Sequence, residues 1–212
     1  MTHPAPPHAV ALLVRHGHTD AVGHRLVGRL PGVALSACGR VQAERLRHRL
    51  AAMPLAAVYS SPLERAMETA RPLAADHGLH VTRADGLAEC DFGDWTGATF
   101  ADLEQLASWR RFNTHRSLAE VPGGETALDV QRRIVRTLDT LRRSHAGETI
   151  VLVTHQDVIR AALLHCAGAS LDFYDRFVIA PGSITTLELN DAGWRIAASN
   201  TSAEEVLPLS HS

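Results

Sequence analysis

The stretch Leu12–Asp20, with the sequence LLVRHGHTD, decides the fold and carries the first residues of a candidate site. The apolar run that begins at Val10 stops at Arg15, and such a run ending in polar residues and glycine is typical of a buried strand. Arg15 and His16 therefore follow the strand at the end where open α/β sheets bind ligands. Arginine binds phosphate through two parallel N–H groups, and histidine serves as a nucleophile or proton carrier near neutral pH. Gly17 allows a close backbone approach to a ligand.

A second buried strand, over residues 149–153, ends in a similar way and is followed closely by His155. A shorter strand over 56–59 precedes a helix, for which the pair Ser61-Pro62 is predicted as N-cap and first-turn residue. Arg65 lies in the first turn of that helix, where the positive end of the helix dipole favours a neighbouring anion.

The carboxyl ends of parallel strands meet at one edge of a sheet. We therefore expect two arginines and two histidines, Arg15, Arg65, His16 and His155, to converge there. This set of residues suits an oxyanion with a high negative charge, such as a phosphoryl group.

Strands alternate with helices along the chain, which is typical of a mostly parallel sheet with helices on both faces. We predict a three-layer α/β/α fold, with a single domain over 9–200, a disordered lead-in over 1–8 and a loose tail over 201–212. The expected strands are 9–14, 56–59, 80–83 and 149–153, followed by a hairpin of 183–189 and 194–198. The expected helices are 37–52, one beginning at Pro62, 99–110, 125–143 and 156–167. The inward residues of helix 125–143 are expected to be Leu128, Val135, Leu138 and Leu141.

Composition narrows the function classes. The 212 residues include 21 basic and 23 acidic ones, so nothing indicates a nucleic-acid or membrane surface. Three cysteines lie far apart without a CxxC pair, which indicates neither a disulfide framework nor a zinc knuckle. The N-terminus has no charged-then-apolar signal pattern, and no apolar run is long enough to span a membrane. We expect a cytoplasmic enzyme without cofactor or metal. The sequence leaves open whether it forms a homodimer.

Four motifs resemble those of the histidine phosphatase superfamily, the phosphoglycerate-mutase-like proteins. They occur in the order of that family and span most of the chain: Arg15-His16-Gly17-x-Thr19, the stretch 60–70 around Arg65, the stretch 87–97 around Glu89, and Val153-Thr154-His155. The resemblance implies the phosphoglycerate-mutase-like fold and places the chain in the phosphatase branch.

The residues suit phosphoryl transfer to water. A neutral His16 attacks phosphorus and forms a phosphohistidine, while Arg15, Arg65 and a protonated His155 neutralise the phosphoryl oxygens. Glu89 is the candidate acid for the leaving alkoxide, because nearby aromatic residues and bound phosphate raise its pKa. The substrate is expected to be a small-molecule phosphomonoester.

Three further residues are candidates for substrate binding: Thr19, Gln156 and His18. Gln156 replaces a glycine that many members of the family have after the second histidine. Its backbone N–H can still donate a hydrogen bond to phosphate. A substrate-facing and a solvated position are both open for His18, where the family often has glutamate. Val22 replaces an asparagine that helps to hold phosphate in many members.

Three alternatives are weighed against this interpretation. Glu89 and His155 lie 66 positions apart (155 − 89), which is shorter than in the mutases of the family and favours a phosphatase over a cofactor-dependent phosphoglycerate mutase. A non-catalytic phosphate or phosphoprotein binder would not need all four catalytic positions. A metal-dependent hydrolase is suggested by the spacing His16-x-His18-x-Asp20, but Ala21 stands where the final histidine of that motif belongs.

Overall fold

The computed structural model describes residues 8–203. The predicted lead-in over 1–8 and tail over 201–212 therefore lie largely outside the described residues. Thr201, the first residue of the predicted tail, still belongs to the last strand, and its hydroxyl donates to the carbonyl of Ile184 at 3.1 Å.

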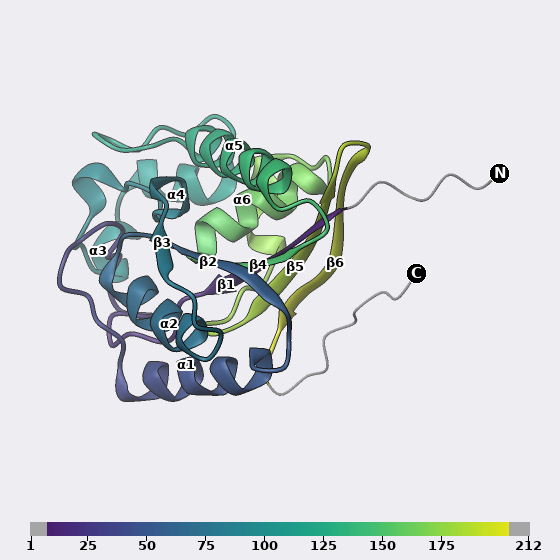
Figure 1. Ribbon diagram of the computed structural model, residues 1–212. Helices are drawn as coiled ribbons and strands as arrows, with labels where there is room; N and C mark the ends of the chain where they lie inside the picture. The colour runs from purple at the N-terminus through teal and green to yellow at the C-terminus, as the bar shows by residue number, and fades with distance from the viewer. Residues whose placement is uncertain (1–7, 204–212) are drawn as a thin grey trace.

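A six-stranded sheet in the order β3-β2-β4-β1-β5-β6 forms the middle of the molecule (Figure 1). The strands are β1 Ala9–Arg15, β2 Leu55–Ser60, β3 Val81–Arg83, β4 Thr149–Thr154, β5 Ile184–Asn190 and β6 Gly193–Thr201. The first four strands are mutually parallel, whereas β5 runs antiparallel to β1 and forms the predicted hairpin with β6. The sheet is thus mostly parallel, as predicted.

Helices cover both faces of the sheet and complete the predicted three layers. The helices are α1 Ala37–Leu50, α2 Glu64–Ala75, α3 Phe100–Leu103, α4 Ala107–Thr114, α5 Ala127–Ser144 and α6 Gln156–Cys166. Three 3-10 turns are η1 Asp85–Leu87, η2 Gly93–Trp95 and η3 Leu171–Arg176. Figure 1 shows α1 and α2 on one face and α5 and α6 on the other.

The apolar run of β1 is buried because both of its faces are covered. Leu12 and Val14 pack into the core under α1 and α2, whereas Ala11 and Leu13 pack into the core under α5 and α6. All four are fully buried. Side chains alternate across a strand, so a helix layer on each face requires a continuous apolar run rather than an alternating one.

The inward face of α5 differs from the prediction. Thr126 and Asp129 form a capping box at its start, and the buried residues are Ala127, Val130, Ile134, Leu138 and Leu141. Leu128 is 38% exposed and Val135 is only half-buried. The observed set has the regular spacing of three and four residues that is typical of one helix face, and this face begins at Ala127.

Two predicted helix boundaries are wrong. Leu63, not Ser61, is the N-cap of α2, because the Ser61 hydroxyl already accepts the backbone N–H of Leu63 and contacts a buried histidine. The helix expected over 99–110 is divided into α3 and α4, with Leu106 in an extended conformation between them.

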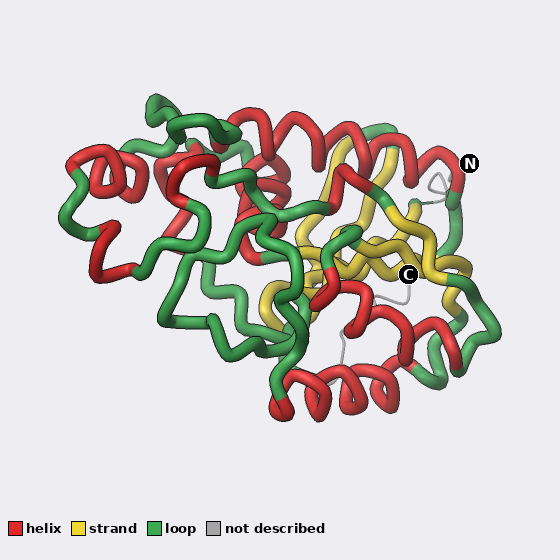
Figure 2. Tube along the Cα trace, turned by 90° about the vertical axis from the view of Figure 1, so that its left-hand side faces the viewer, coloured by secondary structure: helices red, strands yellow, loops and turns green. Residues whose placement is uncertain are grey.

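The sheet register brings the polar strand ends to one level. Arg15 pairs with Thr154 across β1 and β4, and Ser60 of β2 pairs with Val153. Figure 2 looks onto this end, where loops and turns gather between the two helix layers.

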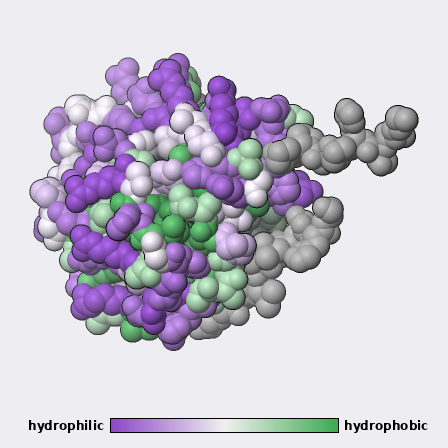
Figure 3. All heavy atoms as spheres, in the orientation of Figure 1, coloured by the Kyte–Doolittle hydropathy of each residue, from purple (hydrophilic) through white to green (hydrophobic). Residues whose placement is uncertain are grey.

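The surface is mostly hydrophilic in the view of Figure 3, with an apolar area over the sheet edge formed by β2 and β3. Within residues 8–203, no helix is both long and apolar enough to cross a membrane.

Candidate active site

The two predicted histidines lie side by side, with ring centroids 5.0 Å apart. His16 Nδ1 donates to the carbonyl of Gly17 at 2.7 Å, since a carbonyl oxygen can only accept. His16 Nε2 therefore keeps its lone pair, and Arg65 Nε donates to that atom at 3.3 Å. Burial, with Arg65 as the next cause, lowers the pKa of His16 well below its usual value, so the ring is neutral.

His155 is neutral as well, whereas the sequence analysis expected a protonated ring. Its Nδ1 accepts from Arg65 Nη2 at 3.3 Å, so its Nε2 carries the proton and donates to Ser61 Oγ at 2.8 Å. Burial, then Arg65, lowers the pKa of His155 well below its usual value. A protonated ring would place a second cation against Arg65 in a buried site, which is the physical reason for the difference.

Two arginines, the buried Arg65 and the half-buried Arg15, present unpartnered donors. Arg65 is 1% exposed, and its Nη2 donates to the carbonyl of Gly28 at 2.7 Å. Arg15 Nη1 donates to the carbonyl of Ile179 at 2.5 Å. Arg65 Nη1 and Arg15 Nε are buried without a hydrogen-bond partner among the described residues. Buried guanidinium donors need an acceptor, so this arrangement is prepared for an anion.

Close backbone contacts hold the loop after β1. A Cβ added at Gly17 would lie 2.5 Å from the carbonyl oxygen of Gly39, and one at Gly39 would lie 2.1 Å from that of His18. Thr69 Oγ1 accepts the N–H of Gly17 at 3.0 Å and donates to the carbonyl of Arg65 at 2.8 Å. Gly17 therefore allows the close approach of helix α1, and the approach of a ligand expected for it stays a prediction.

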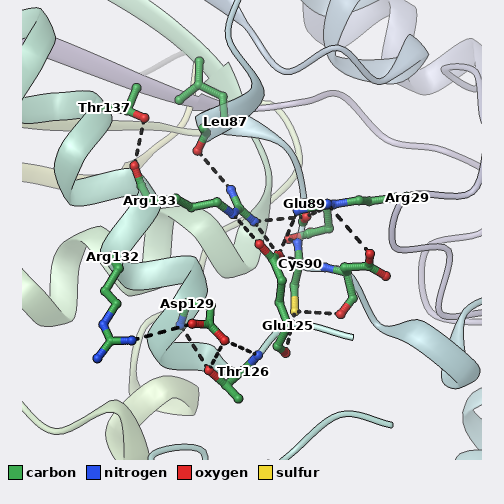
Figure 4. A network of polar contacts seen from close by, with 12 residues as sticks. Arg29, Leu87, Glu89, Cys90, Glu125, Thr126, Asp129, Arg132, Arg133 and Thr137 are labelled. Atoms are coloured by element: carbon green, nitrogen blue, oxygen red, sulfur yellow. Dashed lines mark hydrogen bonds and ion pairs between the residues drawn. The ribbon is translucent and has the colours of Figure 1, made fainter. Parts of the chain in front are cut away.

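An ionic network positions the backbone of Glu89 (Figure 4). The Glu89 carbonyl accepts from Arg29 Nε at 2.8 Å and from Arg133 Nη2 at 3.1 Å. Glu125 pairs with both arginines, at 2.8 Å to Arg29 and 3.0 Å to Arg133, and also accepts the N–H of Asp91 at 3.0 Å. The loop after β1 and helix α5 are thereby connected to the segment that carries the Glu89 carboxyl group.

The pKa of the Glu89 carboxyl group is raised, so that its protonated and ionised forms are both present near neutral pH. Burial, followed by the charge of Asp157, raises its pKa to about 7. The hydrogen bond from the N–H of Cys90 to Glu89 Oε1, at 2.8 Å, acts in the opposite direction and lowers the pKa. The Asp157 carboxylate is held by Arg116 at 3.3 Å, and Tyr174 donates to the backbone carbonyl of Asp157. The Arg116 guanidinium lies 4.1 Å above the ring of Tyr174.

A cavity of about 290 Å³ opens onto these groups. Its polar lining residues are Arg15, His16, Thr19, Arg25, Arg65, Glu89, Gln156 and Asp157. Gln156 and Asp157 form the first turn of α6, where backbone N–H groups and the helix dipole favour an anion. The structure thus brings most of the predicted site residues to one cavity.

Two predicted residues stand apart from the cavity lining. His155 lies behind His16 and Arg65 and is fully buried. The ring of His18 instead bonds Ser36 Oγ at 2.9 Å, and its backbone N–H donates to Gln42 at 2.7 Å. His18 is therefore committed to the N-terminus of α1, and the geometry does not favour the substrate contact considered for it.

The spacing His16-x-His18-x-Asp20 does not produce a cluster of ligands. His16 Nε2 faces the Arg65 guanidinium, the His18 ring is turned to Ser36, and Asp20 is exposed. Within residues 8–203, no three metal-ligating side chains gather in a group that could hold a metal ion.

Sequence reasoning missed the residues that orient the site. Ser61 was interpreted as an N-cap although it anchors His155, and Thr69 is the hydroxyl one helical turn after Arg65. Both lie within the arginine motif, so the motif itself was the available signal. The pairing of Arg29 with Glu125 joins residues 96 positions apart and had no local signal.

Comparison with known proteins identifies the family. The model of the histidine phosphatase superfamily (branch 1) matches residues 11–202. This chain belongs to that superfamily. The predicted family, fold and enzyme class, a phosphatase with a phosphoglycerate-mutase-like fold, are confirmed.

Three similar proteins illustrate the range of relatives. Phosphoglycerate mutase-like protein 4 of Arabidopsis thaliana is 35% identical over 159 residues, covering 73% of this chain and 69% of the relative. Phosphoserine phosphatase 1 of Hydrogenobacter thermophilus is 32% identical over 166 residues, covering 76% of each. The native structure of a mycobacterial glucosyl-3-phosphoglycerate phosphatase superimposes with a TM-score of 0.84 at 27% identity, covering 93% of this chain and 100% of that chain.

Proposed function

We propose that this chain hydrolyses phosphomonoesters through a phosphohistidine on His16, with Glu89 as proton donor to the leaving group. The observation that carries the proposal is the lone pair of His16 Nε2, which lies beside a buried guanidinium in a cavity that also contains a protonated carboxyl group. The relatives named as phosphatases of small phosphorylated compounds support the same reaction class.

Binding of the phosphoryl group uses Arg15 and Arg65. Arg15 Nε and Arg65 Nη1 have no hydrogen-bond partner among the described residues, and both side chains line the cavity, Arg15 from the end of β1 and Arg65 from the start of α2. The first turn of α6 adds backbone N–H groups near Gln156, and Thr19 adds a hydroxyl to the lining. These donors neutralise the equatorial oxygens, which is most of what phosphoryl transfer requires of a protein.

The attack on phosphorus follows from the orientation of His16. The Nδ1–H bond to Gly17 fixes the tautomer and leaves the lone pair on Nε2, which accepts from Arg65 Nε and has to pass from this hydrogen bond to phosphorus in the attack. In the first step a bond forms between Nε2 and phosphorus, and the bond from phosphorus to the ester oxygen breaks. His155 is proposed as a positioning residue, because its contacts are to Arg65 and Ser61.

The leaving alkoxide takes a proton from Glu89. Glu89 is favoured over three nearby carboxylates, because Glu125 is ion-paired with Arg29 and Arg133, Asp91 lies 3.8 Å from Arg29, and Asp94 is exposed. In the second step the Glu89 carboxylate removes a proton from water, and the water oxygen displaces His16 from phosphorus. Phosphate is released and the starting protonation states return.

We expect purified protein to release phosphate from alkyl phosphomonoesters after dialysis against EDTA, since no step uses a metal. The same assay with 3-phosphoglycerate and a trace of 2,3-bisphosphoglycerate should give more phosphate than 2-phosphoglycerate, because the short segment between Glu89 and His155 favours a phosphatase. Loss of activity on chelation with recovery on zinc or manganese would refute the phosphohistidine route. Isomer exchange faster than phosphate release would support the mutase alternative, and absence of turnover with tight phosphate binding would support a non-catalytic binder.

The pH profile should follow Glu89. Its carboxyl group donates a proton only below its pKa of about 7, so kcat/KM for an alkyl phosphate should fall tenfold per pH unit well above pH 7. Asp157→Asn removes a charge that raises this pKa, so the descending limb should move to lower pH. The exposed Asp94→Asn removes an equal charge nearby and should leave the limb in place. A limb that is identical in wild type and Asp157→Asn would assign it to the substrate phosphate instead.

We further propose a cytoplasmic location and a small-molecule substrate. Cys38, Cys90 and Cys166 form no disulfide, which is consistent with a reducing compartment. The homodimer left open by the sequence stays a prediction.

A further inference from the structure

The cavity lining includes an apolar part besides the phosphate donors. Its apolar lining residues are Ala21, Val22, Leu26, Val27, Phe92 and Phe100. They come from the loop after β1 and from the segments next to Glu89 and at the start of α3. The group of the substrate that leaves with the ester oxygen must therefore lie against an apolar wall, including the position where Val22 cannot donate a hydrogen bond.

Arg25 is a cation at the solvent side of this apolar wall. It lines the cavity and is exposed, in contrast to the half-buried Arg15 and the buried Arg65. Its backbone is held in a short antiparallel bridge with Thr99, which is flanked by the bond from Leu26 N to the carbonyl of Ala98 at 3.0 Å. Arg25 is thus held at the mouth of the cavity by main-chain bonds on both sides.

Two other charged residues of this region, Asp157 in the cavity lining and Arg29 on the loop, already have partners. Asp157 is paired with Arg116, and Arg29, the next arginine along the loop, is paired with Glu125. Across residues 8–203, no carboxylate lies within ion-pair distance of Arg25. A cation at the mouth of a substrate cavity that is not used by the protein is available to a charged group of the ligand.

We propose that Arg25 is a specificity residue, which selects phosphomonoesters whose leaving alcohol has an apolar body and a second anionic group at its far end. This inference rests on the proposed function and extends it to the substrate class. Arg15 and Arg65 hold the phosphate, the apolar wall accommodates the body of the alcohol, and Arg25 binds the distal anion.

The test compares two probes of similar shape and electronic character, 4-carboxyphenyl phosphate and 4-carbamoylphenyl phosphate. In the wild type, kcat/KM for the anionic probe should exceed that for the neutral probe by about threefold to tenfold at low salt, which is the range for a partly exposed charge-assisted pair. Arg25→Gln should reduce this ratio to about one, mainly through KM. The exposed Arg71→Gln, which removes an equal charge from α2, should keep the wild-type ratio.

A second variant tests the apolar wall. Val22→Asn should lower kcat/KM for phenyl phosphate relative to glycerol 2-phosphate, since it places an amide against the alcohol. An anionic-to-neutral ratio that is the same in Arg25→Gln as in the wild type would overturn the assignment of Arg25, and so would an equal loss in Arg71→Gln. Failure of every form to release phosphate from any probe would instead refute the proposed function.

Discussion

His16→Ala should abolish phosphate release from every phosphomonoester, with kcat/KM lower by roughly 10⁴-fold or more. The imidazole supplies the atom that bonds to phosphorus, since His16 lines the cavity and its Nε2 carries a lone pair that faces Arg65 Nε. Leaving-group quality should not matter, because the covalent intermediate cannot form with any substrate. The exposed His48→Ala is the matched control and should keep wild-type activity.

The intermediate itself can be observed. Wild-type enzyme mixed with radiolabelled substrate and quenched in alkali should retain protein-bound label that is lost in acid, as expected for phosphohistidine. His16→Ala should retain none. A variant that keeps turning over, or label that survives acid, would show that His16 is not the nucleophile.

Glu89→Gln should impair the two halves of the reaction differently. An alkyl phosphate expels a strongly basic alkoxide, so its first step should slow by roughly 10²–10⁴-fold without the acid. A nitrophenyl phosphate expels a weak base, so its first step should be much less affected. Water attack on the phosphohistidine should be slow with either substrate, because the amide cannot accept the proton that the Glu89 carboxylate accepts.

Rapid mixing of Glu89→Gln with nitrophenyl phosphate should therefore give a burst of nitrophenol approaching one per site. Glutamine keeps an oxygen for the N–H of Cys90, so the local backbone should be preserved. The exposed Asp94→Asn serves as the neighbouring control and should show neither the burst nor the dependence on the leaving group. Equal losses on both substrates without a burst would exclude Glu89 as the proton carrier and direct attention to Asp91 and Glu125.

The sequence determined the elements that present the chemistry. The uninterrupted apolar runs before Arg15 and Thr154 could only be strands covered on both faces, and parallel strands share their carboxyl edge. The place of Arg15 and His16 at the cavity follows from this rule, and Arg65 joins them because α2 begins shortly after β2, a parallel strand of the same sheet. Local periodicity was less informative for α5, where the buried face begins at the small residue Ala127 and the larger Leu128 is exposed.

Only the tertiary structure decided the protonation and the orientation of the site. His155 is neutral because it is buried and because Arg65, 90 positions away in the chain, donates to its Nδ1, and its Nε2–H donates to Ser61 Oγ. Burial and the charge of Asp157 raise the pKa of Glu89 to about 7; the sequence predicted the effect of burial from nearby aromatic residues, whereas the effect of Asp157 depends on the fold. Charge states depend on burial and on neighbours brought together by folding, whereas strands and helices can be recognised from residues that are close in the sequence.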